Sequence, residues 1–546
     1  MKKYFIILAG LAAAAMVSCT KEFSPESVSA GKTLTLSVSR EIPGEDTKSA
    51  LSGTSVVFQA NDEVSVLSGS ENAKFTTAAG GATASFSGTA SEAEQYLVLS
   101  PYNANATLAS PSVVNFTIPS VQVATPDGVD PNALISAGIF RPGDSSVQLY
   151  NAVGLVKIEV PSGITAKQIQ IGGGRGATIG ICGDFTFNAS TQVVGVVSMS
   201  RIITLVPAEG EDVIAPGTYY IAVRPKPDFE GLVVAYLNGD NVLCKRISSE
   251  GSMIYINRSH IVPIGSLDSN YSPVTGRATL RYAGDAPQFT GLLKQLAGGA
   301  TAANASDNAV KKIVFKAHTL YSQEYKGQVT VNGNKIANVI SNGPNSDIQI
   351  HAWVEDGTAY VYTEAPVITL YNASANLFRD FAGLEEVSFN DVNAMDGASF
   401  EYLFRNCTSL KSVDFGNADF SKVANWSFAF VTANLNTGVP SALESVSLGE
   451  TATTSATNMT SMFSQAFVLK NLYLGKNFAL APSVNGMFNG TASVTTTQID
   501  DEGHGMQCKL FASQALWDAL NVDLNDDGVN ATTLFNTHRF FFTPVE

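Results

Sequence analysis

The sequence predicts a mainly β protein in which two β-sandwich domains precede an α/β solenoid. Between residues 377 and 488, a series of phenylalanines and a series of leucines recur with the same period, and we call these series the two apolar ladders. Such a repeat is typical of a solenoid. Short strand-like runs separated by turn residues fill residues 32–266, which is typical of β-sandwiches. Only 15% of the 546 residues are charged and the formal net charge is −15, so we expect neither nucleic acid nor an anionic lipid surface as a partner.

The N-terminus has the pattern of a secretion signal. Lys2 and Lys3 precede an apolar segment over residues 5–16, and small residues close this segment before Cys19. The segment is too short to span a bilayer as a helix, which needs about 20 residues. The pattern resembles a lipobox and predicts a signal peptide over residues 1–18, with Cys19 as the lipid-modified first residue of the mature chain. A simple secretory signal is the alternative.

The residues after Cys19 predict where the protein is displayed. Residues 20–22 read Thr-Lys-Glu and resemble the export tag of surface lipoproteins in the Bacteroidota. This resemblance implies a lipoprotein of the outer membrane that faces outward and touches the membrane through its lipid alone. Residues 19–31 are expected to be its tether.

Residues 32–144 are predicted to form the first sandwich. Strand-like runs alternate with turn signals at residues 33–38, 56–58, 63–67, 83–86, 95–99 and 113–118. Residues 57–66, VFQANDEVSV, resemble the fimbrillin signature W-x-x-G-D-x-I-x-V, with Phe58 in the place of Trp and Asn61 in the place of Gly. Residues 96–102, YLVLSPY, resemble the Y-x-A-x-Y-P region of the same family.

Residues 145–266 are predicted to form the second sandwich. Residues 147–160 resemble the opening of a fimbrillin C-terminal domain, and residues 216–223, PGTYYIAV, resemble its P-G-x-Y strand. The resemblance implies two transthyretin-like sandwiches, which agrees with the strand pattern.

Arg40 ends the first predicted strand. In fimbrillins an Arg-specific protease cuts just after this strand, which removes the lipid and opens a groove for a donor strand from the next subunit. By this resemblance Arg40 is a candidate processing site. An arginine that protects an edge strand from aggregation is the alternative.

The solenoid is predicted from its own repeat. Residues 267–276 read as a linker, residues 277–374 as the start and cap of the solenoid, residues 375–490 as its repeats and residues 491–546 as a C-terminal cap. Within the caps, the expected elements are helices over residues 289–296 and 510–520, strands over 312–316, 328–331 and 539–544, and a hairpin over 351–362.

Phenylalanines and leucines mark the repeat unit. Phenylalanines stand 26, 26, 33 and 25 residues apart, and leucines follow at intervals of 26, 33 and 26: Phe378, Phe404, Phe430, Phe463 and Phe488; Leu384, Leu410, Leu443 and Leu469. The longer interval falls in residues 431–441, between a turn and a strand, so both ladders survive it. Residues 406–410 and 456–463 resemble the BspA-like leucine-rich repeats of bacterial surface proteins.

Four cysteines remain beyond Cys19. Cys407 occupies an apolar position of the repeat, which predicts a buried core residue. Cys182 and Cys244 lie in one predicted domain and could pair in an oxidising compartment. The sequence does not decide between a disulfide and two free thiols.

One segment has part of a calcium-binding pattern. Asp523, Asn525, Asp527 and a following glycine spell the first half of a calcium loop. Its twelfth position is Leu534 rather than an acidic residue. The alternatives are a weak structural calcium site and a polar turn, and no other cofactor is expected.

Catalytic motifs are not evident. Residues 172–176 are glycine-rich, but a strand-like segment follows where a phosphate loop needs a helix. The five histidines are scattered and there is no Cys-x-x-Cys. We therefore expect no enzyme.

The parts together predict a surface-exposed adhesin. Residues 267–546 follow the second sandwich, which suits a tip or accessory subunit of a pilus better than a shaft subunit. The expected partners are a host or bacterial surface protein or glycan, and other pilus subunits through donor-strand addition. Glycan capture for nutrition and a purely structural surface role are the alternatives.

Overall fold

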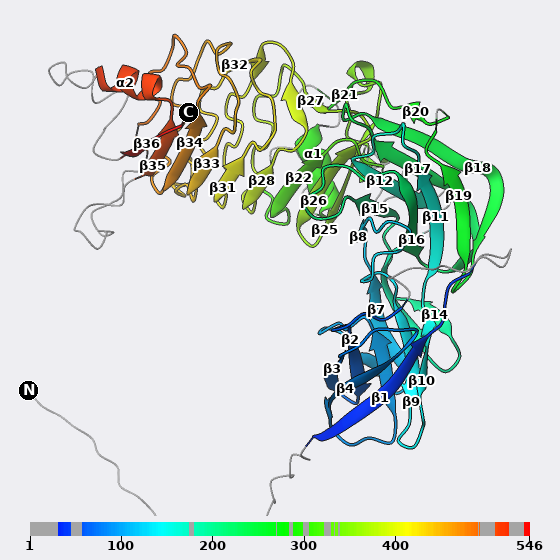
Figure 1. Cartoon of the computed structure of the whole chain (residues 1–546). Coiled ribbons are helices and arrows are strands. Elements are labelled where there is room, and N and C mark those ends of the chain that lie inside the picture. The colour runs from blue at the N-terminus through cyan, green and yellow to red at the C-terminus, as the bar shows by residue number, and fades with distance from the viewer. Residues whose placement is uncertain are drawn as a thin grey trace, which may run out of the picture.

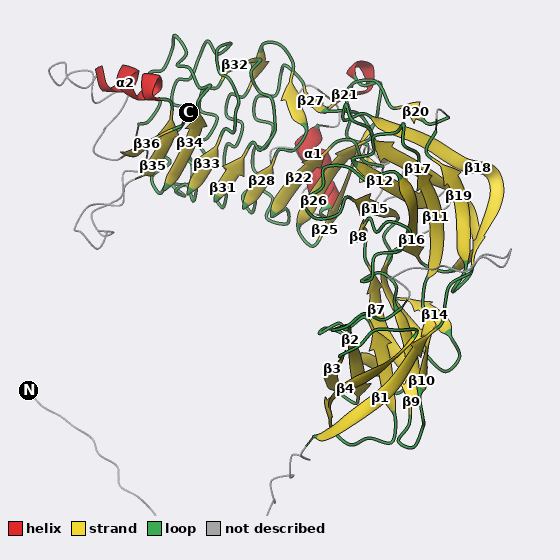
Figure 2. Ribbon diagram, viewed as in Figure 1, coloured by secondary structure: helices red, strands yellow, loops and turns green. Residues whose placement is uncertain are grey.

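Among the residues that the structure describes, β-strands form almost every regular element, which confirms the mainly β prediction (Figures 1 and 2). The computed structural model describes residues 31–44, 57–173, 180–268, 270–282, 285, 288–298, 305–320, 329–331, 334–336, 339–489, 491, 508–522 and 540–545. Along the chain, a barrel comes first, a body of several sheets second and a repeat array third (Figure 1).

The N-terminal body is a closed β-barrel with the strand order β1-β10-β9-β5-β2-β3-β4. Its strands are β1 (Lys32–Arg40), β2 (Glu63–Ser68), β3 (Glu71–Thr77), β4 (Thr83–Ala90), β5 (Tyr96–Ser100), β9 (Ser136–Phe140) and β10 (Val147–Asn151). The first strand closes the ring, because it pairs antiparallel with β4 and parallel with β10. Leu36, Phe86 and Val98 belong to the apolar core inside the ring.

The second body contains three sheets with the orders β16-β11-β19, β20-β18-β17-β12-β15-β8 and β14-β13-β7-β6. Its strands are β6 (Leu108–Ser110), β7 (Val113–Ile118), β8 (Val121–Val123), β11 (Gly154–Val160), β12 (Gln168–Gly173), β13 (Gly183–Asn188), β14 (Val193–Val196), β15 (Ile202–Val206), β16 (Gly217–Val223), β17 (Lys226–Leu237), β18 (Leu243–Ile256), β19 (Ile261–Ser266) and β20 (Ser272–Pro273). One large core joins these sheets.

The strands do not follow the division expected at residues 144 and 145. Strand β10 was expected in the second domain but completes the barrel, whereas β7 and β8 were expected in the first domain but pair with β13 and β15. The reason lies in β5, whose residues are buried on both faces. Tyr96 and Val98 fill the barrel, while Leu97 and Leu99 join the core of the second body. An apolar outer face of this kind must be covered by another sheet.

The repeat array is built on a nine-stranded sheet with the order β25-β26-β22-β28-β31-β33-β34-β35-β36. These strands are β22 (Lys312–Lys316), β25 (Ile350–Glu355), β26 (Thr358–Thr363), β28 (Glu386–Ser388), β31 (Ser412–Asp414), β33 (Ser445–Ser447), β34 (Asn471–Gly475), β35 (Cys508–Ala512) and β36 (Phe540–Pro544). All neighbours from β26 onward pair in parallel. The second residue of each of the strands β28, β31, β33 and β34 is buried, and these residues are in register: Val387, Val413, Val446 and Leu472.

Smaller elements complete the array on its other sides. They are β21 (Ala278–Thr279), β23 (Val329–Val331), β24 (Asn334–Ile336), β27 (Ile368–Leu370), β29 (Val392–Ala394), β30 (Ala398–Ser399), β32 (Val423–Asn425), the short helix η1 (Gly343–Asn345), α1 (Phe289–Leu296) and α2 (Gln514–Val522). The predicted hairpin is present as β25 and β26, with Asp356 and Gly357 at positive φ in its turn.

Both regions predicted as caps also add strands to the sheet. Strands β22 and β26 begin the parallel sheet before residue 375, and β35 and β36 continue it after residue 490. The helix expected over residues 510–520 therefore starts only at Gln514. Helix α1 agrees with the prediction and covers one end of the core, where Phe289 meets Phe378 edge-on at 5.9 Å.

The segment expected as a linker, residues 267–276, is packed against the second body. Leu267 is fully buried, and the ring of Tyr271 lies 5.5 Å from that of Tyr236. Strand β20 within it pairs with β18. A linker exposed to solvent would not bury such large side chains.

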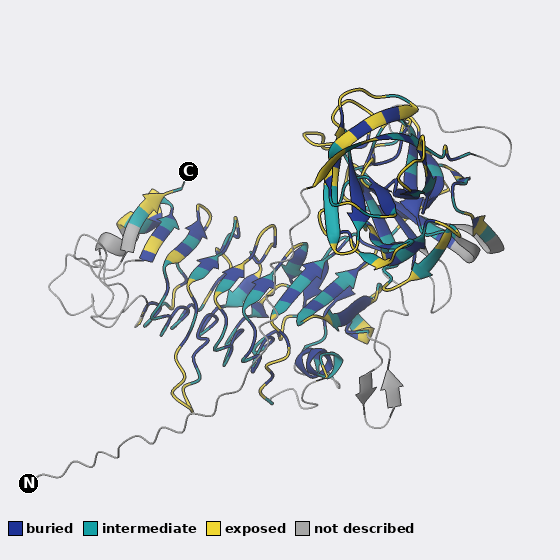
Figure 3. Cartoon of the chain, turned by 90° about the horizontal axis from the view of Figure 1, so that it is seen from below, coloured by how far each residue is buried: buried dark blue, intermediate teal, exposed yellow. Residues whose placement is uncertain are grey.

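The second body and the array share a buried joint. Gln170 of β12 is fully buried, accepts a hydrogen bond from the backbone N–H of Leu320 at 2.7 Å and donates one to the carbonyl of His318 at 3.2 Å. Lys245 of β18 reaches Glu364 of the array at 2.5 Å. The nine-stranded sheet lies on the side of the array that is turned toward the barrel. This side is the lower edge of the array in Figure 1 and is seen from below in Figure 3.

Candidate functional site

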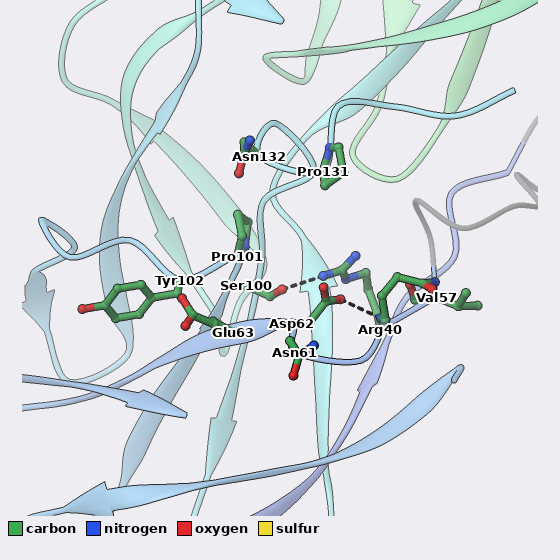
Figure 4. Close-up of a pocket in the computed structure, with 11 residues that line it drawn as sticks. Arg40, Val57, Asn61, Asp62, Glu63, Ser100, Pro101, Tyr102, Pro131 and Asn132 are labelled. Carbon is green, nitrogen blue, oxygen red and sulfur yellow. Dashed lines mark hydrogen bonds between the residues drawn. The ribbon is translucent and has the colours of Figure 1, made fainter. Parts of the chain in front are cut away.

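A polar pocket opens at the end of the barrel where β1 stops (Figure 4). Its volume is about 290 Å³. The residues that line it are Arg40, Val57, Gln59, Asn61, Asp62, Glu63, Ser100, Pro101, Tyr102, Pro131 and Asn132. They come from the end of β1, from the loop and start of β2, from the end of β5 and from the loop before β9.

Arg40 reaches this pocket because side chains alternate along β1. Leu36 and Val38 point into the barrel, and Arg40 follows them on the same side of the strand. Its Nη2 donates to Ser100 Oγ at 2.5 Å, and the guanidinium lies 4.7 Å from the ring centre of Phe58. Burial lowers the pKa of Arg40 to about 10, although the nearby Asp62 carboxylate acts in the opposite direction. Arg40 is therefore still charged at neutral pH.

The acidic groups of the pocket already have partners. Asp62 Oδ2 accepts a hydrogen bond from the backbone N–H of Gln59 at 2.8 Å. Glu63 forms an ion pair with Lys74 at 2.9 Å. The lining contains neither histidine nor cysteine, and its serine, Ser100, accepts the hydrogen bond from Arg40. Its chemistry suits the binding of a polar group.

The predicted processing position lies inside the sheet. Arg40 pairs with Leu149 of β10, and the N–H of Glu41 donates to the carbonyl of Leu149 at 2.8 Å. A protease needs an extended segment that is not paired, so β1 must leave β10 before the bond after Arg40 can be cut. Cleavage at Arg40 stays a prediction.

The predicted phenylalanine ladder is a column of stacked rings inside the array. Successive ring centres lie 5.1, 6.0, 5.0 and 5.5 Å apart from Phe378 through Phe404, Phe430 and Phe463 to Phe488. The leucines of the second ladder are all buried. Cys407 is also buried, as predicted, and its thiol points to the carbonyl of Phe378 at 2.9 Å. The repeat therefore produces one continuous core.

A ladder of alternating charges runs beside the strands of the array. Equivalent places are occupied by Lys311, Glu385, Lys411, Glu444 and Lys470, since from Glu385 onward the backbone N–H of each donates to the carbonyl of the one before. Lys509 follows Lys470 in the same way, so the alternation of charge ends at Lys470. Glu385 pairs with Lys411 at 2.5 Å, and Glu444 pairs with Lys470 at 3.0 Å. The hydrogen bond from Lys411 lowers the pKa of Glu385 and raises that of Lys411. Opposite charges on neighbouring units favour this register over a shifted one.

The cysteines and the suggested metal site can be placed only in part. Cys182 and Cys244 are buried and free, so they do not form a disulfide in this structure. No group of three or more potential ligands occurs among the residues that the structure describes. Asp523, Asn525 and Asp527 lie outside those residues, and the calcium prediction stays untested.

The lipid-anchor prediction also falls outside the described residues, because Cys19 and the preceding signal are not among them. Within the described part of the chain, no helix has the length and apolar character needed to cross a membrane. Residues 172 and 173 of the glycine-rich segment end strand β12, and the rest of that segment is not described.

The fold and the site define a mainly β chain with a polar pocket and a repeat array. No protein-family model matches the chain, and no curated protein matches it. Solved structures that align with it include a candidate cell adhesion protein from Bacteroides ovatus, with 13% identity over 44% of this chain and 95% of that chain and a TM-score of 0.29. Another is the tip fimbrial protein Mfa3 from Porphyromonas gingivalis in a C-terminally truncated form, with 9% identity over 44% and 98% and a TM-score of 0.21.

A fimbrial protein from Bacteroides ovatus aligns with 12% identity over 47% of this chain and 52% of that chain, with a TM-score of 0.20. All three alignments cover less than half of this chain, and all three TM-scores are below 0.5.

Proposed function

We propose that the protein is a surface-exposed, lipid-anchored adhesin or a tip or accessory subunit of a pilus, with the array as its binding surface. The observation that carries this proposal is the position of the array. Strand β1 starts at the end of the barrel that points away from the array, so an anchor before β1 holds the array far from the membrane (Figure 1). A long regular surface at the outer end suits recognition of another surface.

In this proposal the array is a BspA-like leucine-rich-repeat solenoid, and the bodies before it are a divergent fimbrillin-like pair. The parallel sheet with one strand per unit and the stacked phenylalanines support the first assignment. The short strands of residues 32–266 support the second. The proposal includes no catalytic role.

The barrel is proposed as the assembly module. Leu36 and Val38 of β1 fill its core, and the main chain of β1 pairs on both sides. If a protease cuts after Arg40 and β1 leaves, the barrel keeps an apolar groove with two unpaired edges. A donor strand from another subunit would restore both the apolar contacts and the main-chain hydrogen bonds.

Processing at Arg40 can be tested on protein released from cells. N-terminal sequencing should show a chain that begins at Glu41, and Arg40→Gln should remain lipid-anchored. Release of a chain that still carries residues 32–40 would contradict this part of the proposal. Palmitate labelling tests the anchor itself, because label must be lost in Cys19→Ala.

Adhesion can be tested with beads coated with the full-length mature chain. Coated beads should be retained on host extracellular matrix or on partner bacteria more strongly than albumin-coated beads. Equal retention on all of these surfaces would overturn the proposed function.

Glycan capture for nutrition is the second candidate. The observation that favours it is the set of aromatic rings that the chain leaves partly exposed, among them Tyr102 at the pocket and Phe428 on the array. An adhesin retains a surface-bound glycan, whereas a capture protein must also hand a soluble glycan to a transporter. Growth on host glycans as sole carbon source, compared between cells with and without the protein, separates the two.

A further inference from the structure

One position in each repeat unit has a left-handed backbone. It lies two residues before each stacked phenylalanine, and φ is 60°, 53°, 56°, 54° and 63° at Asn376, Tyr402, Phe428, Ser461 and Gly486. At this position the backbone N–H donates to a carbonyl of the next unit, for example from Phe428 to Thr460 at 3.0 Å and from Ser461 to Asn485 at 3.0 Å. Stacking of the units therefore imposes the conformation, whichever side chain is present.

Two of the five residues at this position fit the left-handed conformation poorly. Glycine has no Cβ to clash, and asparagine adopts this region more readily than most residues. A bulky residue there is a true outlier with a cost in backbone energy. Tyr402 and Phe428 carry this cost in adjacent units. Folding alone does not require them, since Asn376 and Gly486 make the same turn with less strain.

The two aromatic rings form a stack that stops at Phe428. The rings of Tyr402 and Phe428 lie 4.6 Å apart at an angle of 14°, and the guanidinium of Arg405 lies 5.3 Å from the ring centre of Tyr402. Since Phe428 covers one face of Tyr402, Arg405 lies toward its other face. The next place in the row belongs to Ser461, whose short side chain cannot continue the stack. Phe428 is half-buried, and among the described residues no aromatic ring covers its outer face, so this space can accept one flat ring.

The described residues of the units on either side of this space are uncharged. Residues 423–443, 451–469 and 477–489 contain no Asp, Glu, Lys or Arg. On the unit after Phe428, the hydroxyls of Thr460 and Ser483 lie 2.9 Å apart near the surface. Asn485 and Asn489 are exposed on the following turn. A charged ligand would lose hydration here without gaining a partner of opposite charge.

A neutral sugar ring fits this combination. One face of a pyranose presents C–H groups that pack on an aromatic ring, and its rim presents hydroxyls that bond to amide and hydroxyl side chains. The space beside Phe428 has the depth of one flat ring, because the preceding unit fills the same place with an aromatic ring. An acidic or basic side chain of a partner protein fits less well, because the site offers it no residue of opposite charge.

We propose that an uncharged pyranose of a glycan stacks on the outer face of Phe428, in the place that Ser461 leaves open. This inference rests on the proposed function and names the class of ligand that the array recognises. The backbone strain at Tyr402 and Phe428 is then the cost of presenting an aromatic platform at a rigid position.

Saturation-transfer NMR on the full-length chain tests the proposal. The probes are methyl β-D-galactopyranoside, methyl β-D-glucopyranoside, methyl α-D-mannopyranoside and N-acetyl-D-glucosamine at millimolar concentration. The wild type should transfer saturation to the ring C–H protons of at least one probe. Phe428→Asn should weaken the signal about tenfold, and Ser461→Tyr should also weaken it because the new ring fills the space.

A thermal scan provides the second readout, the unfolding midpoint of the array. If Phe428 had only a structural role, replacing it should lower this midpoint. Phe428→Asn relieves the backbone strain and should raise the unfolding midpoint of the array while binding is lost. Asn376→Ser, at an equivalent place without an aromatic ring, is the matched control and should leave sugar binding unchanged.

The proposal is overturned if the wild type transfers no saturation to any of the four probes, or if Phe428→Asn and Ser461→Tyr bind as the wild type does. Bead adhesion separates this failure from failure of the proposed function. If wild-type and Phe428→Asn beads adhere equally well, the protein is an adhesin and the Phe428 site is wrong. If wild-type beads do not adhere although the sugar binds, the adhesin assignment fails and the site stands.

Discussion

The barrel and the array are both built from short strands, but the contacts that hold them together differ in how far apart the paired strands lie along the chain. In the barrel, β1 pairs with β10, so that Val38 lies beside Val147. In the array, each strand pairs with that of the next unit, so that Val387 lies beside Val413. The barrel must therefore form as one cooperative unit, whereas the array is stabilised by neighbouring units in sequence. Their cores are also separate sets of residues.

This difference has a functional consequence. A ring that depends on one distant strand can be opened by removing that strand, which suits an assembly module. An array of local contacts keeps its shape along its length and can vary single surface positions, as the row of Asn376, Tyr402, Phe428, Ser461 and Gly486 shows. Recognition and assembly can thus be divided between the two regions.

The largest expected effect comes from breaking the phenylalanine column. Phe404 is fully buried, and its ring lies 5.1, 6.5 and 6.0 Å from those of Phe378, Phe389 and Phe430. Phe404→Ala should destabilise the array by about 3–5 kcal/mol, from lost burial and the cavity left behind. Chemical denaturation followed by tryptophan fluorescence should show an earlier transition for the array, since Trp426 is buried there. An unchanged midpoint would contradict the column as a stabilising element.

The matching change in the barrel is Phe86→Ala. Phe86 is fully buried and meets Phe58 edge-on at 5.0 Å. The expected loss is about 3 kcal/mol, and it should not reach the array, because the cores of the barrel and the array are separate. Hydrogen exchange should show faster exchange in β1 and β4, while the amides of β31 and β33 stay protected. Equal loss of protection in the array would mean that the two regions unfold together.

The joint between the second body and the array should show an intermediate effect. Gln170→Ala leaves the buried N–H of Leu320 and the carbonyl of His318 without their partner from β12. The expected cost is about 1–3 kcal/mol. This cost should appear as faster hydrogen exchange at residues 318–320. The unfolding transitions of the second body and the array should also lie further apart. If the second body and the array still unfold together after this change, the apolar contacts around Leu320 are what stabilise the joint.

The smallest effect is expected from the charge ladder, and it depends on pH. The contact with Lys411 lowers the pKa of Glu385, so its contribution is fully present above the pKa of an unfolded glutamate and is lost as pH falls through the lower folded value. Lys411→Met should therefore lower the denaturation midpoint of the array slightly at neutral pH. The difference from the wild type should shrink in acid and at high salt. A difference independent of both would exclude an electrostatic cause.

The sequence predictions were more accurate for the array than for the barrel and the second body. The array repeats with one period, so its column of phenylalanines and its buried leucines could be predicted from spacing alone. The exchange of β10 and β7 between the first two bodies could not, because strand pairing over long distances leaves no local pattern. The strand over residues 33–38 and the position of Arg40 at its end were predicted correctly, but only the structure shows Arg40 inside a pocket.

The aromatic platform on the array was missed for a different reason. Tyr402 and Phe428 stand one repeat apart, so their stacking could have been inferred once the units were aligned. The left-handed backbone beneath them could not, since neither residue type predicts a positive φ. That conformation follows from hydrogen bonds between units, which appear only in three dimensions.

The division of labour between barrel and array is tested most directly by blocking each region on intact cells. Cells that display the full-length protein would be incubated with Fab fragments against the side of the array that carries Phe428 or against the outer surface of the barrel. Adherence to host matrix or partner bacteria should fall to the level of cells without the protein with the first Fab and stay unchanged with the second. Loss of adherence with the barrel Fab alone would contradict the array as the binding surface.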